Sequence, residues 1–383
     1  MDARDISAFR RLFPVTERLV YLNHASTGPM PSTAVAAITA FAERASREGQ
    51  VPYPDCEAMV EETRGLLGRL LSVEPARIGF TKNTSAGVLI AIGSLDWRPG
   101  DNVVLMADDF PTVIYPFQLM LPDTERRLVT SEALCSDIGS ALDLIDARTR
   151  AVAVSWVHFL TGRRCDIVEL CRVCRERGVT TIIDAIQGIG AVAMDWSTVP
   201  ADFVVSHGAK WLLAPQGSGF MLVHPDTLPR LKPANLGWLS CRWEEFNDIF
   251  TQKPLKPGAS RYEEGTKNHL GIAGFGGSLK VFHEFGVPAV VERVRKLAGL
   301  VRARFERAGF DVVTPAEPER NAGMVTARKP GADLPGLFAQ LEREHCVCSL
   351  RENMLRVAPH FYNTEEEIDR FMDIVESRGS ERA

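Results

Sequence analysis

The sequence lacks long apolar runs. None of its 383 residues fall in a stretch of the roughly 20 consecutive apolar residues that a membrane-spanning helix needs. Residues 1–14 are charged and contain no apolar core of a secretory signal. A basic block is missing too, since 49 acidic and 44 basic residues are mixed along the chain, for a formal net charge of −5. We therefore expect a cytoplasmic protein that binds neither membranes nor nucleic acid.

The eight cysteines lack the spacing of a zinc site. Cys171 and Cys174 form a C-x-x-C pair in an amphipathic helical segment, without the further cysteines or histidines that would complete a zinc set. Cys346 and Cys348 alternate with Val347, as residues on one face of a strand do. We expect eight reduced thiols, with these four buried in the core, and no metal site.

Strand-like runs alternate with helix-like segments between about residues 75 and 225. The runs are RIGF (77–80), NVVLM (102–106), AVAVSWV (151–157), TTIID (180–184), DFVVS (202–206) and GFMLV (219–223). Segment 52–72, before the first run, and segment 165–178 read as helices, the second closed by Gly178. Apolar strands alternating with helices are typical of a parallel sheet covered by helices, so this part of the chain is predicted to be α/β.

The pattern changes near residue 270. A long charged helix follows, and then the shorter strand-like pieces DVVT, GMVTAR and CVCSL. A chain of this length, 45% hydrophobic, is expected to form two domains. We predict a large domain over residues 16–270, with a mostly parallel mixed sheet, and a smaller α+β domain over 271–383 together with 1–15.

Three features point to a ligand site. Asp184 ends the run TTIID, at the sheet edge where open α/β folds bind ligands. Lys210 follows another strand-like run beside Trp211, so burial would lower its pKa and favour an amine nucleophile. The segment TKNTSAGV (81–88) opens an apolar helix and places the Thr84 and Ser85 hydroxyls where an anion could bind. Each feature alone has an ordinary structural explanation, but together they favour a site.

Seven segments, in order, resemble the class V aminotransferases. They are YLNHASTGPMP (21–31), TKNTSAG (81–87), DDFPTVIYPF (108–117), DAIQGIGAVAMD (184–195), ADFVVSHGAKWLLAPQGSGFMLV (201–223), RYEEGTKN (261–268) and LRVAPHFYNTEEEID (355–369). This family of pyridoxal 5′-phosphate enzymes has the aspartate-aminotransferase fold, fold type I, and includes cysteine desulfurases, kynureninase and isopenicillin-N-epimerase-like enzymes. The resemblance implies that fold for almost the whole chain.

The resemblance also implies roles around the cofactor ring. Lys210 would hold pyridoxal phosphate as a Schiff base and move the proton at the Cα of the substrate. Asp184 would bind the pyridinium nitrogen and keep it protonated, so that the ring can accept electrons. Gln187 resembles the residue that contacts the phenolic oxygen of the ring. Phe110 occupies the position of the stacking ring, which is a histidine in desulfurases, and can stack but cannot offer a proton.

The phosphate positions of the family match Thr84, Ser85 and His207. Gly265 and Thr266 resemble a loop that reaches the phosphate from a neighbouring subunit. The resemblance thus implies a homodimer with its active site at the interface.

A carboxylate-binding arginine of the family matches Arg356, and this task suits a bidentate guanidinium. His24 and Ser26, in the NHAS segment, are expected to line the substrate pocket. Arg351 could serve a second carboxylate, or it could be a solvated charge in a loop.

The chain departs from the desulfurase pattern. Desulfurases carry a mobile catalytic cysteine shortly before the carboxylate-binding arginine, where this chain reads RENMLR over 351–356. Cys346 and Cys348 precede this segment in a strand, where a thiol would be fixed and protonated. Ala209 replaces a histidine and Phe159 an asparagine, while His158 could compensate as a neighbour or be a core residue. Transfer of sulfur through a persulfide is therefore disfavoured.

These observations predict an enzyme that acts on an α-amino acid, either a β-elimination lyase of the C–S type or an aminotransferase. An epimerase or a desulfurase-like enzyme stays open as an alternative. Two alternatives come from other classes. A nicotinamide oxidoreductase is opposed by the lack of G-x-G-x-x-G after the first strand. A catalytically inactive ligand-binding member of the family is opposed by the presence of both Asp184 and Lys210.

Overall fold

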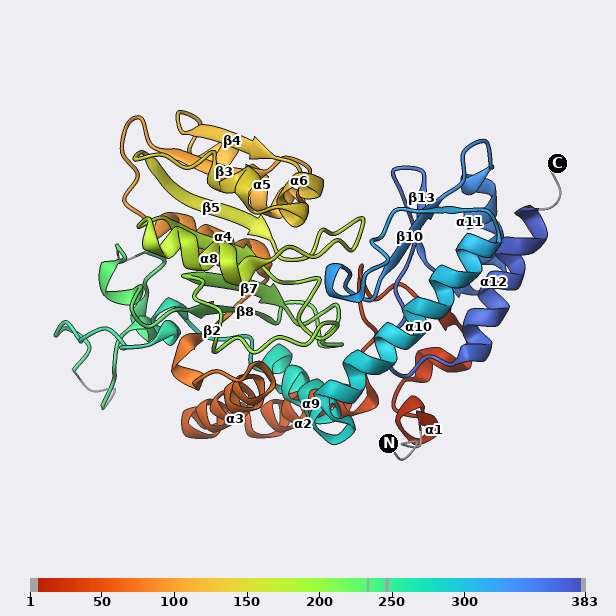
Figure 1. Cartoon of the computed structure of the whole chain (residues 1–383). Coiled ribbons are helices and arrows are strands. Elements are labelled where there is room, and N and C mark those ends of the chain that lie inside the picture. The colour runs from red at the N-terminus through yellow and green to blue at the C-terminus, as the bar shows by residue number, and fades with distance from the viewer. Residues whose placement is uncertain (1–5, 233, 245–247, 380–383) are drawn as a thin grey trace.

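The structure is a computed structural model that describes residues 6–232, 234–244 and 248–379. A seven-stranded sheet forms the centre of one part, and a four-stranded sheet forms the centre of a smaller part (Figure 1). Helix α10 (Val287–Arg307) runs between the two parts in Figure 1. The predicted combination of a large α/β unit with a smaller α+β unit is confirmed.

The large sheet has the strand order β2-β8-β7-β6-β5-β3-β4. Its strands are β2 (Ile78–Thr81), β3 (Asn102–Met106), β4 (Glu125–Val129), β5 (Thr149–Ser155), β6 (Thr180–Asp184), β7 (Phe203–His207) and β8 (Gly219–Val223). Strands β4, β3, β5, β6 and β7 are parallel, and β8 runs antiparallel to both β7 and β2. The prediction of a mostly parallel mixed sheet is therefore confirmed.

Edge strand β4 was not predicted. Its sequence, ERRLV, is mostly exposed and charged, with only Val129 buried. The five residues of its neighbour β3, by contrast, are all buried. An edge strand needs no apolar residues on its outer side, and charges there discourage pairing with another chain.

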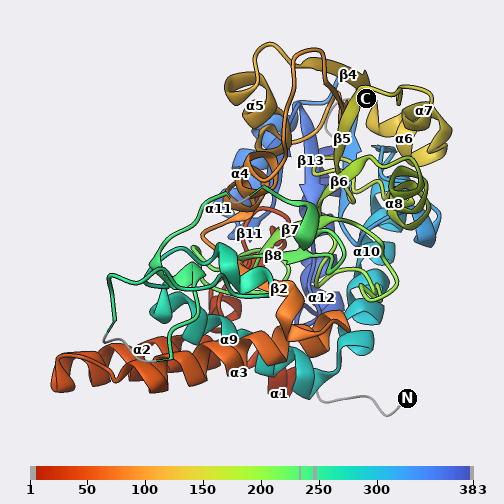
Figure 2. The same ribbon diagram turned by 90° about the vertical axis from the view of Figure 1, so that its left-hand side faces the viewer.

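Helices cover both faces of the large sheet. In Figure 2, α4 (Thr84–Gly93) and α5 (Pro111–Met120) lie on one side, and α6 (Ser131–Ser136), α7 (Gly139–Leu142) and α8 (Ile167–Glu176) on the other. Both faces of the strands are accordingly buried in apolar clusters. The predicted helix over 165–178 is α8, which ends before Gly178 at φ 72°, a left-handed conformation that favours glycine.

Three helices lie together below the large sheet in both views, namely α2 (Ser32–Glu48), α3 (Tyr53–Leu71) and α9 (His269–Phe285) (Figures 1 and 2). Helix α3 confirms the helix predicted over 52–72. Gly277 of α9 lets the helices approach, since a Cβ there would lie 2.7 Å from the Thr33 carbonyl oxygen. The domain boundary after residue 270 stays a prediction, and α9, which spans it, packs on elements of the large part.

The smaller part contains the antiparallel sheet β12-β13-β10-β9. Its strands are β9 (Asp311–Val312), β10 (Val325–Arg328), β12 (Ser349–Arg351) and β13 (Met354–Val357), and α10, α11 (Leu334–Arg343) and α12 (Glu365–Gly379) accompany them. A parallel pair, β1 (Val20–Tyr21) with β11 (Cys346–Val347), joins residues near the two ends of the chain. Arg10 of α1 (Ile6–Arg10) binds Glu367 of α12 at 2.7 Å. The amino-terminal segment thus packs on the smaller part.

Short 3-10 helices complete the described elements. They are η1 (Pro14–Glu17), η2 (Pro75–Arg77), η3 (Leu228–Arg230), η4 (Trp238–Ser240), η5 (Ala259–Tyr262) and η6 (Pro318–Arg320). Directly after η5, the buried carboxylate of Glu263 pairs with Arg64 of α3 at 2.6 Å and accepts the Phe80 amide at 2.9 Å. Breaking a buried pair of this kind typically costs about 3–5 kcal/mol. This pair therefore fixes the start of the segment that carries Gly265 and Thr266.

The cysteines correct one expectation. Cys135 and Cys165 form a disulfide, so the prediction of eight reduced thiols is wrong for this pair. Residues 156–165 fold back on themselves, with the Cys165 amide bonded to the Trp156 carbonyl, and bring Cys165 to α6. The other six cysteines are free. Cys171, Cys174, Cys346 and Cys348 are buried, as predicted.

Among the described residues, no helix combines the length and the apolar character that crossing a bilayer requires. The same residues contain no group of three or more metal-ligating side chains. The cytoplasmic location stays a prediction.

Candidate active site

A cavity of about 440 Å³ lies at the carboxyl edge of the large sheet. Ser155, Asp184 and His207 are the last residues of the neighbouring strands β5, β6 and β7, and all three line it. Ligands of open α/β folds bind at this edge, because the loops that leave parallel strands meet there. The remaining lining residues are Ala25, Ser26, Thr27, Asn83, Thr84, Ser85, Phe110, Thr112, Val157, Phe159, Ile186, Gln187, Lys210, Arg351 and Arg356.

The amine of Lys210 enters this cavity from the turn after β7. Its Nζ lies 5.6 Å from the centroid of the Phe110 ring. Burial lowers the pKa of Lys210 to about 8; Asp184 opposes this shift, while Arg356 and Arg351 add to it. A substantial fraction of the amine is thus neutral near physiological pH, as a nucleophile requires.

The carboxylate of Asp184 is only 3% exposed and faces the same cavity. Its Oδ1 accepts the Ile186 amide at 2.9 Å. Burial raises the pKa of Asp184 to about 7; the Ile186 bond and Lys210 oppose this rise, and Asp109 adds to it. A buried carboxylate with this shift is stabilised by a cationic ligand group placed against it.

The amino terminus of α4 forms another wall of the cavity. The Asn83 side chain caps the helix by accepting the Ala86 amide at 2.9 Å. Thr84 Oγ1 is buried and has no hydrogen-bond partner among the described residues, whereas Ser85 Oγ pairs with Thr112 Oγ1 at 2.5 Å. An unpaired buried hydroxyl at a helix amino terminus suits an anionic ligand group.

His207 lies at the end of β7 in the same cavity. Its Nε2 accepts the Gly217 amide at 3.1 Å. Burial lowers the pKa of His207 to about 4, with a further contribution from Lys210. The ring is therefore neutral near pH 7 and can contact a ligand without adding charge.

Gln187 and Gly28 hold the segments around Lys210 together. The Gln187 side chain donates to the Ala25 carbonyl and accepts from the Trp211 indole, both at 2.9 Å. Its amide nitrogen has a second N–H, which can serve a ligand. A Cβ at Gly28 would lie 2.2 Å from the Lys210 carbonyl oxygen, so the NHASTG segment packs directly on the lysine turn only because residue 28 is glycine.

Arg356 reaches the cavity from strand β13 of the smaller part. The side chain is 2% exposed and donates to Ser26 Oγ at 2.8 Å and to the Phe159 carbonyl at 2.5 Å. Its buried Nε has no partner among the described residues. Burial lowers the pKa of Arg356 to about 10, helped by Arg351. A carboxylate bound here would gain a fixed guanidinium.

Comparison with known families agrees with this geometry. The family model Aminotransferase class-V matches residues 20–371. The chain belongs to the class V aminotransferases. These are pyridoxal-phosphate enzymes, so the protein is a pyridoxal-phosphate-dependent enzyme, and the alternatives of a nicotinamide oxidoreductase and an inactive member of the family are set aside.

Similar proteins in this family differ in their reactions. The chain is 30% identical to an isopenicillin N epimerase of Streptomyces clavuligerus, over 94% of both chains. It is 26% identical to a probable cysteine desulfurase of Methanothermobacter thermautotrophicus, over 96% of both chains. A kynureninase of Deinococcus radiodurans is 25% identical, over 87% of this chain and 83% of the other. Membership of the family therefore leaves the reaction open.

Solved structures show the same fold. The cystine C–S lyase C-DES, in complex with its product cysteine persulfide, superposes with a TM-score of 0.87 at 22% identity and covers 96% of this chain and 100% of its own. A cysteine desulfurase from Thermococcus onnurineus NA1 gives a TM-score of 0.85 at 19% identity, with 98% of both chains covered. The predicted fold type I is thus confirmed.

Pyridoxal phosphate fits the residues of the cavity. The unpaired Thr84 hydroxyl and the α4 terminus suit the phosphate, and the buried Asp184 carboxylate suits the pyridinium nitrogen. The Lys210 amine lies in the same cavity, over the face of the Phe110 ring. Seven of the nine predicted cofactor residues line this one cavity, and Gly265 and Thr266 do not.

Gly265 and Thr266 line a second cavity of about 270 Å³, with Lys82, Gly217 and Glu264 among its other residues. Within one chain they are therefore apart from the Lys210 cavity. This placement is compatible with their predicted role toward a neighbouring subunit and excludes them from the lining of their own site.

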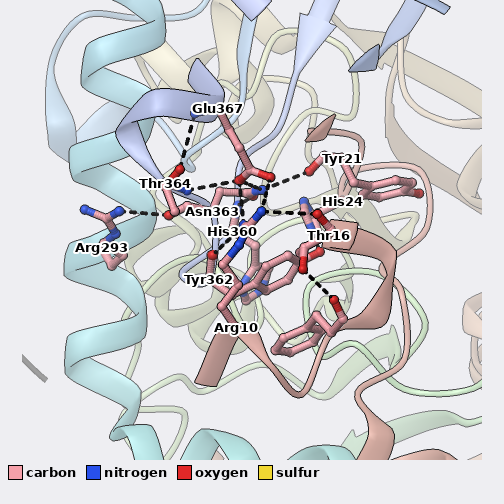
Figure 3. Close-up of polar contacts among 11 residues, drawn as sticks. Arg10, Thr16, Tyr21, His24, Arg293, His360, Tyr362, Asn363, Thr364 and Glu367 are labelled. Carbon is pink, nitrogen blue, oxygen red and sulfur yellow. Dashed lines mark hydrogen bonds and ion pairs between the residues drawn. The ribbon is translucent and has the colours of Figure 1, made fainter. Parts of the chain in front are cut away.

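The structure corrects the expectation for His24, which does not line the cavity. The ring is fully buried in a polar network between the amino-terminal segment and the smaller part (Figure 3). Its nitrogens are paired with the Ala358 carbonyl and the Tyr362 hydroxyl, each at 2.7 Å. Burial lowers the pKa of His24 well below its usual value, aided by His360. Both ring nitrogens are satisfied inside the protein, so His24 has a structural position.

His158 is also a structural residue. Its nitrogens pair with Thr161 Oγ1 at 2.9 Å and with the Asp108 carbonyl at 2.8 Å, outside the cavity lining. Ser155, which sequence reasoning missed, does line the cavity and donates to the buried Asp109 at 2.6 Å. Its position at the end of a predicted strand, level with Asp184 in the sheet, is the signal that could have revealed it.

We expect Asp184→Asn to raise the melting temperature of the cofactor-free protein at pH 8. The pKa of Asp184 is about 7 in the folded protein and 3.8 ordinarily, so the unfolded chain releases this proton at lower pH than the folded protein does. The folded state therefore loses stability as pH rises from about 4 toward 7. The gain should therefore be largest at pH 8 and should shrink toward pH 4. Cofactor affinity should fall roughly tenfold or more, because the pyridinium loses its carboxylate partner.

Thermal unfolding across this pH range, with and without pyridoxal phosphate, provides the measurement. Asp195→Asn is a suitable control, because Asp195 is exposed and bonds only within its own turn. Equal melting temperatures for wild type and Asp184→Asn at every pH would contradict the assignment.

Proposed function

We propose that the protein removes the Cα proton of an α-amino acid with Lys210 and acts as a β-elimination lyase or an aminotransferase. The observation that carries this proposal is the single acid–base amine in the cavity. Phe110, whose ring faces Lys210, has no ionisable proton. The remaining ionisable lining residues are Asp184, His207, Arg351 and Arg356, so Lys210 carries the only amine among the described lining residues.

In this proposal each residue of the cavity has a separate role. Arg356 binds the α-carboxylate and, with Ser26 and the Phe159 carbonyl fixing its guanidinium, orients the substrate. Lys210 takes the Cα proton, and whenever that proton goes back to Cα, Lys210 returns it from the same side, so the configuration is retained. Pyridoxal phosphate, when bound, supplies an electron sink for the electrons left at Cα, and Asp184 favours that state by its negative charge.

Transfer of sulfur to a protein thiol is not part of the proposal. No cysteine is among the described residues that line the cavity. Burial raises the pKa of Cys346 to about 11 and raises that of Cys348 further above its usual value. Both thiols are thus protonated and buried, so neither can accept sulfur. A released β-substituent would instead diffuse from the cavity into solution.

Epimerisation is the second candidate. It is favoured by the 30% identity to an isopenicillin N epimerase over 94% of both chains. Inversion at Cα requires a proton donor on the face opposite Lys210, and Phe110, the ring that lies beside the Lys210 amine, cannot donate one. We therefore propose epimerisation only as the second candidate.

We expect purified enzyme in deuterated buffer to exchange the Cα hydrogen of its substrates with retention of configuration. β-Substituted amino acids should give pyruvate and ammonia without a keto acid if elimination is the reaction, and strict dependence on a keto acid would identify transamination. Lys210→Ala should lower either rate at least about 100-fold, because the proton carrier is lost. Mass spectrometry and chiral chromatography provide the measurements.

Arg328→Ala is the control in this assay, since Arg328 lies on β10 in an exposed ion pair with Asp311 and is not among the cavity-lining residues. Accumulation of the opposite enantiomer without any keto acid would overturn the lead in favour of epimerisation.

We further propose that the protein works as a homodimer in which Gly265 and Thr266 complete the partner's phosphate site. The second cavity that these residues line supports this arrangement. Large apolar side chains near it in the chain are exposed, with Trp238, Ile249 and Phe250 at 44%, 54% and 96%. Such side chains are suited to burial against another subunit.

Mixing two inactive variants tests this arrangement. Lys210→Ala removes the amine, and Gly265→Glu should repel the phosphate; residue 265 has room for a side chain, because a Cβ there would come no closer than 3.9 Å to Trp238. If Gly265 acts in the partner's site, co-refolded variants should recover about a quarter of the wild-type activity, since half of the dimers have one intact site. No recovery, despite mixed dimers detected by mass spectrometry, would show that the loop does not act across the interface.

A further inference from the structure

Arg351 and Arg356 lie on one face of a short hairpin. Strand β12 pairs with β13 so that Arg351 is opposite Met354 and Ser349 is opposite Arg356. Glu352 and Asn353 form the two-residue turn, with φ of 48° and 53°. Because side chains alternate along a strand, Arg351 and Arg356 are diagonal neighbours on the same face, about 7–8 Å apart at the backbone. Both side chains line the Lys210 cavity.

The two guanidinium groups differ in their surroundings. Arg356 is buried and bonded to Ser26 and Phe159. Arg351 is exposed and makes no hydrogen bond or ion pair with any described residue. Its charge nevertheless acts in the cavity, because it contributes to the lowered pKa of both Lys210 and Arg356. Arg351 is therefore placed to take a partner from a bound ligand.

The charge balance of the cavity indicates the kind of partner. Among the described lining residues, the cationic side chains are Lys210, Arg351 and Arg356, and the only carboxylate is that of Asp184. In the proposed function Asp184 serves the pyridinium nitrogen and Arg356 serves the α-carboxylate. The α4 terminus and Thr84 serve the phosphate, so the Arg351 guanidinium lacks an anionic partner.

We propose that Arg351 binds a second carboxylate, at the end of the substrate side chain, so that the enzyme prefers dicarboxylic α-amino acids of about glutamate length. This inference rests on the proposed function and narrows it. Two arginines diagonal across one hairpin can each hold one carboxylate of such a molecule in bidentate fashion. Glutamate has no leaving group on its β-carbon, so a preference for glutamate favours transamination over β-elimination.

Glutamate and glutamine provide matched probes, because they have nearly the same size and differ in the charge of the side-chain terminus. We expect titration of the holoenzyme, followed by the change in cofactor absorbance, to give a dissociation constant roughly tenfold lower for L-glutamate than for L-glutamine. Arg351→Gln should abolish this preference and leave the affinity for glutamine almost unchanged. Arg351→Lys should restore part of it, since an ammonium keeps the charge and loses the fork.

Arg343→Gln is the matched control, because Arg343 is an exposed arginine at the end of α11 and is absent from the cavity lining. It removes the same charge from the same part of the protein and should keep the wild-type preference. Circular dichroism confirms the fold of each variant.

Equal dissociation constants for glutamate and glutamine in the wild type would overturn the inference, as would a preference that persists in Arg351→Gln. These outcomes differ from a failure of the proposed function. In that case no α-amino acid, alanine and cysteine included, would change the cofactor absorbance, and the inference would fall with the function on which it rests.

Discussion

Burial of one carboxylate and one amine at the same sheet edge is the constraint on which the rest of the site depends. Burial shifts both groups toward neutrality, with a pKa of about 7 for Asp184 and about 8 for Lys210. Each shift has a chemical use, because the carboxylate favours a cationic ring nitrogen and the amine becomes a nucleophile and a base. The parallel strands β5, β6 and β7 supply this environment by ending side by side in a largely apolar sheet.

The smaller part of the chain completes the site through a few direct contacts. Arg356 extends from β13 to Ser26 and to the Phe159 carbonyl, and so joins the hairpin to both the amino-terminal segment and the large part. Behind it, His360 bonds the Trp211 carbonyl at 2.9 Å, directly after Lys210. The position of the Arg356 guanidinium is thus tied to that of the Lys210 amine through the packed interior.

Sequence patterns were sufficient where local chemistry decides the structure. Runs such as TTIID predicted the central strands, and the position of Asp184 at a strand end located the cavity. The sequence did not predict the edge strand β4, because most of its residues are charged or exposed and it lacks the apolar run that marks a central strand. The placement of His24 and the Cys135–Cys165 disulfide depended on contacts between segments distant in the chain, which no local pattern encodes. The sequence alone did not decide whether Arg351 faces the site or is a solvated loop charge, because the hairpin register decides which face it occupies.

Covalent attachment of pyridoxal phosphate to Lys210 is the central claim of this account. Borohydride reduction of the holoenzyme, followed by digestion and mass spectrometry, tests it most directly, because reduction makes the bond between the cofactor and the amine permanent. The account predicts one modified peptide, with the cofactor on Lys210, and no adduct in Lys210→Ala. An adduct on another lysine, or a loaded enzyme that yields no adduct at all, would contradict it.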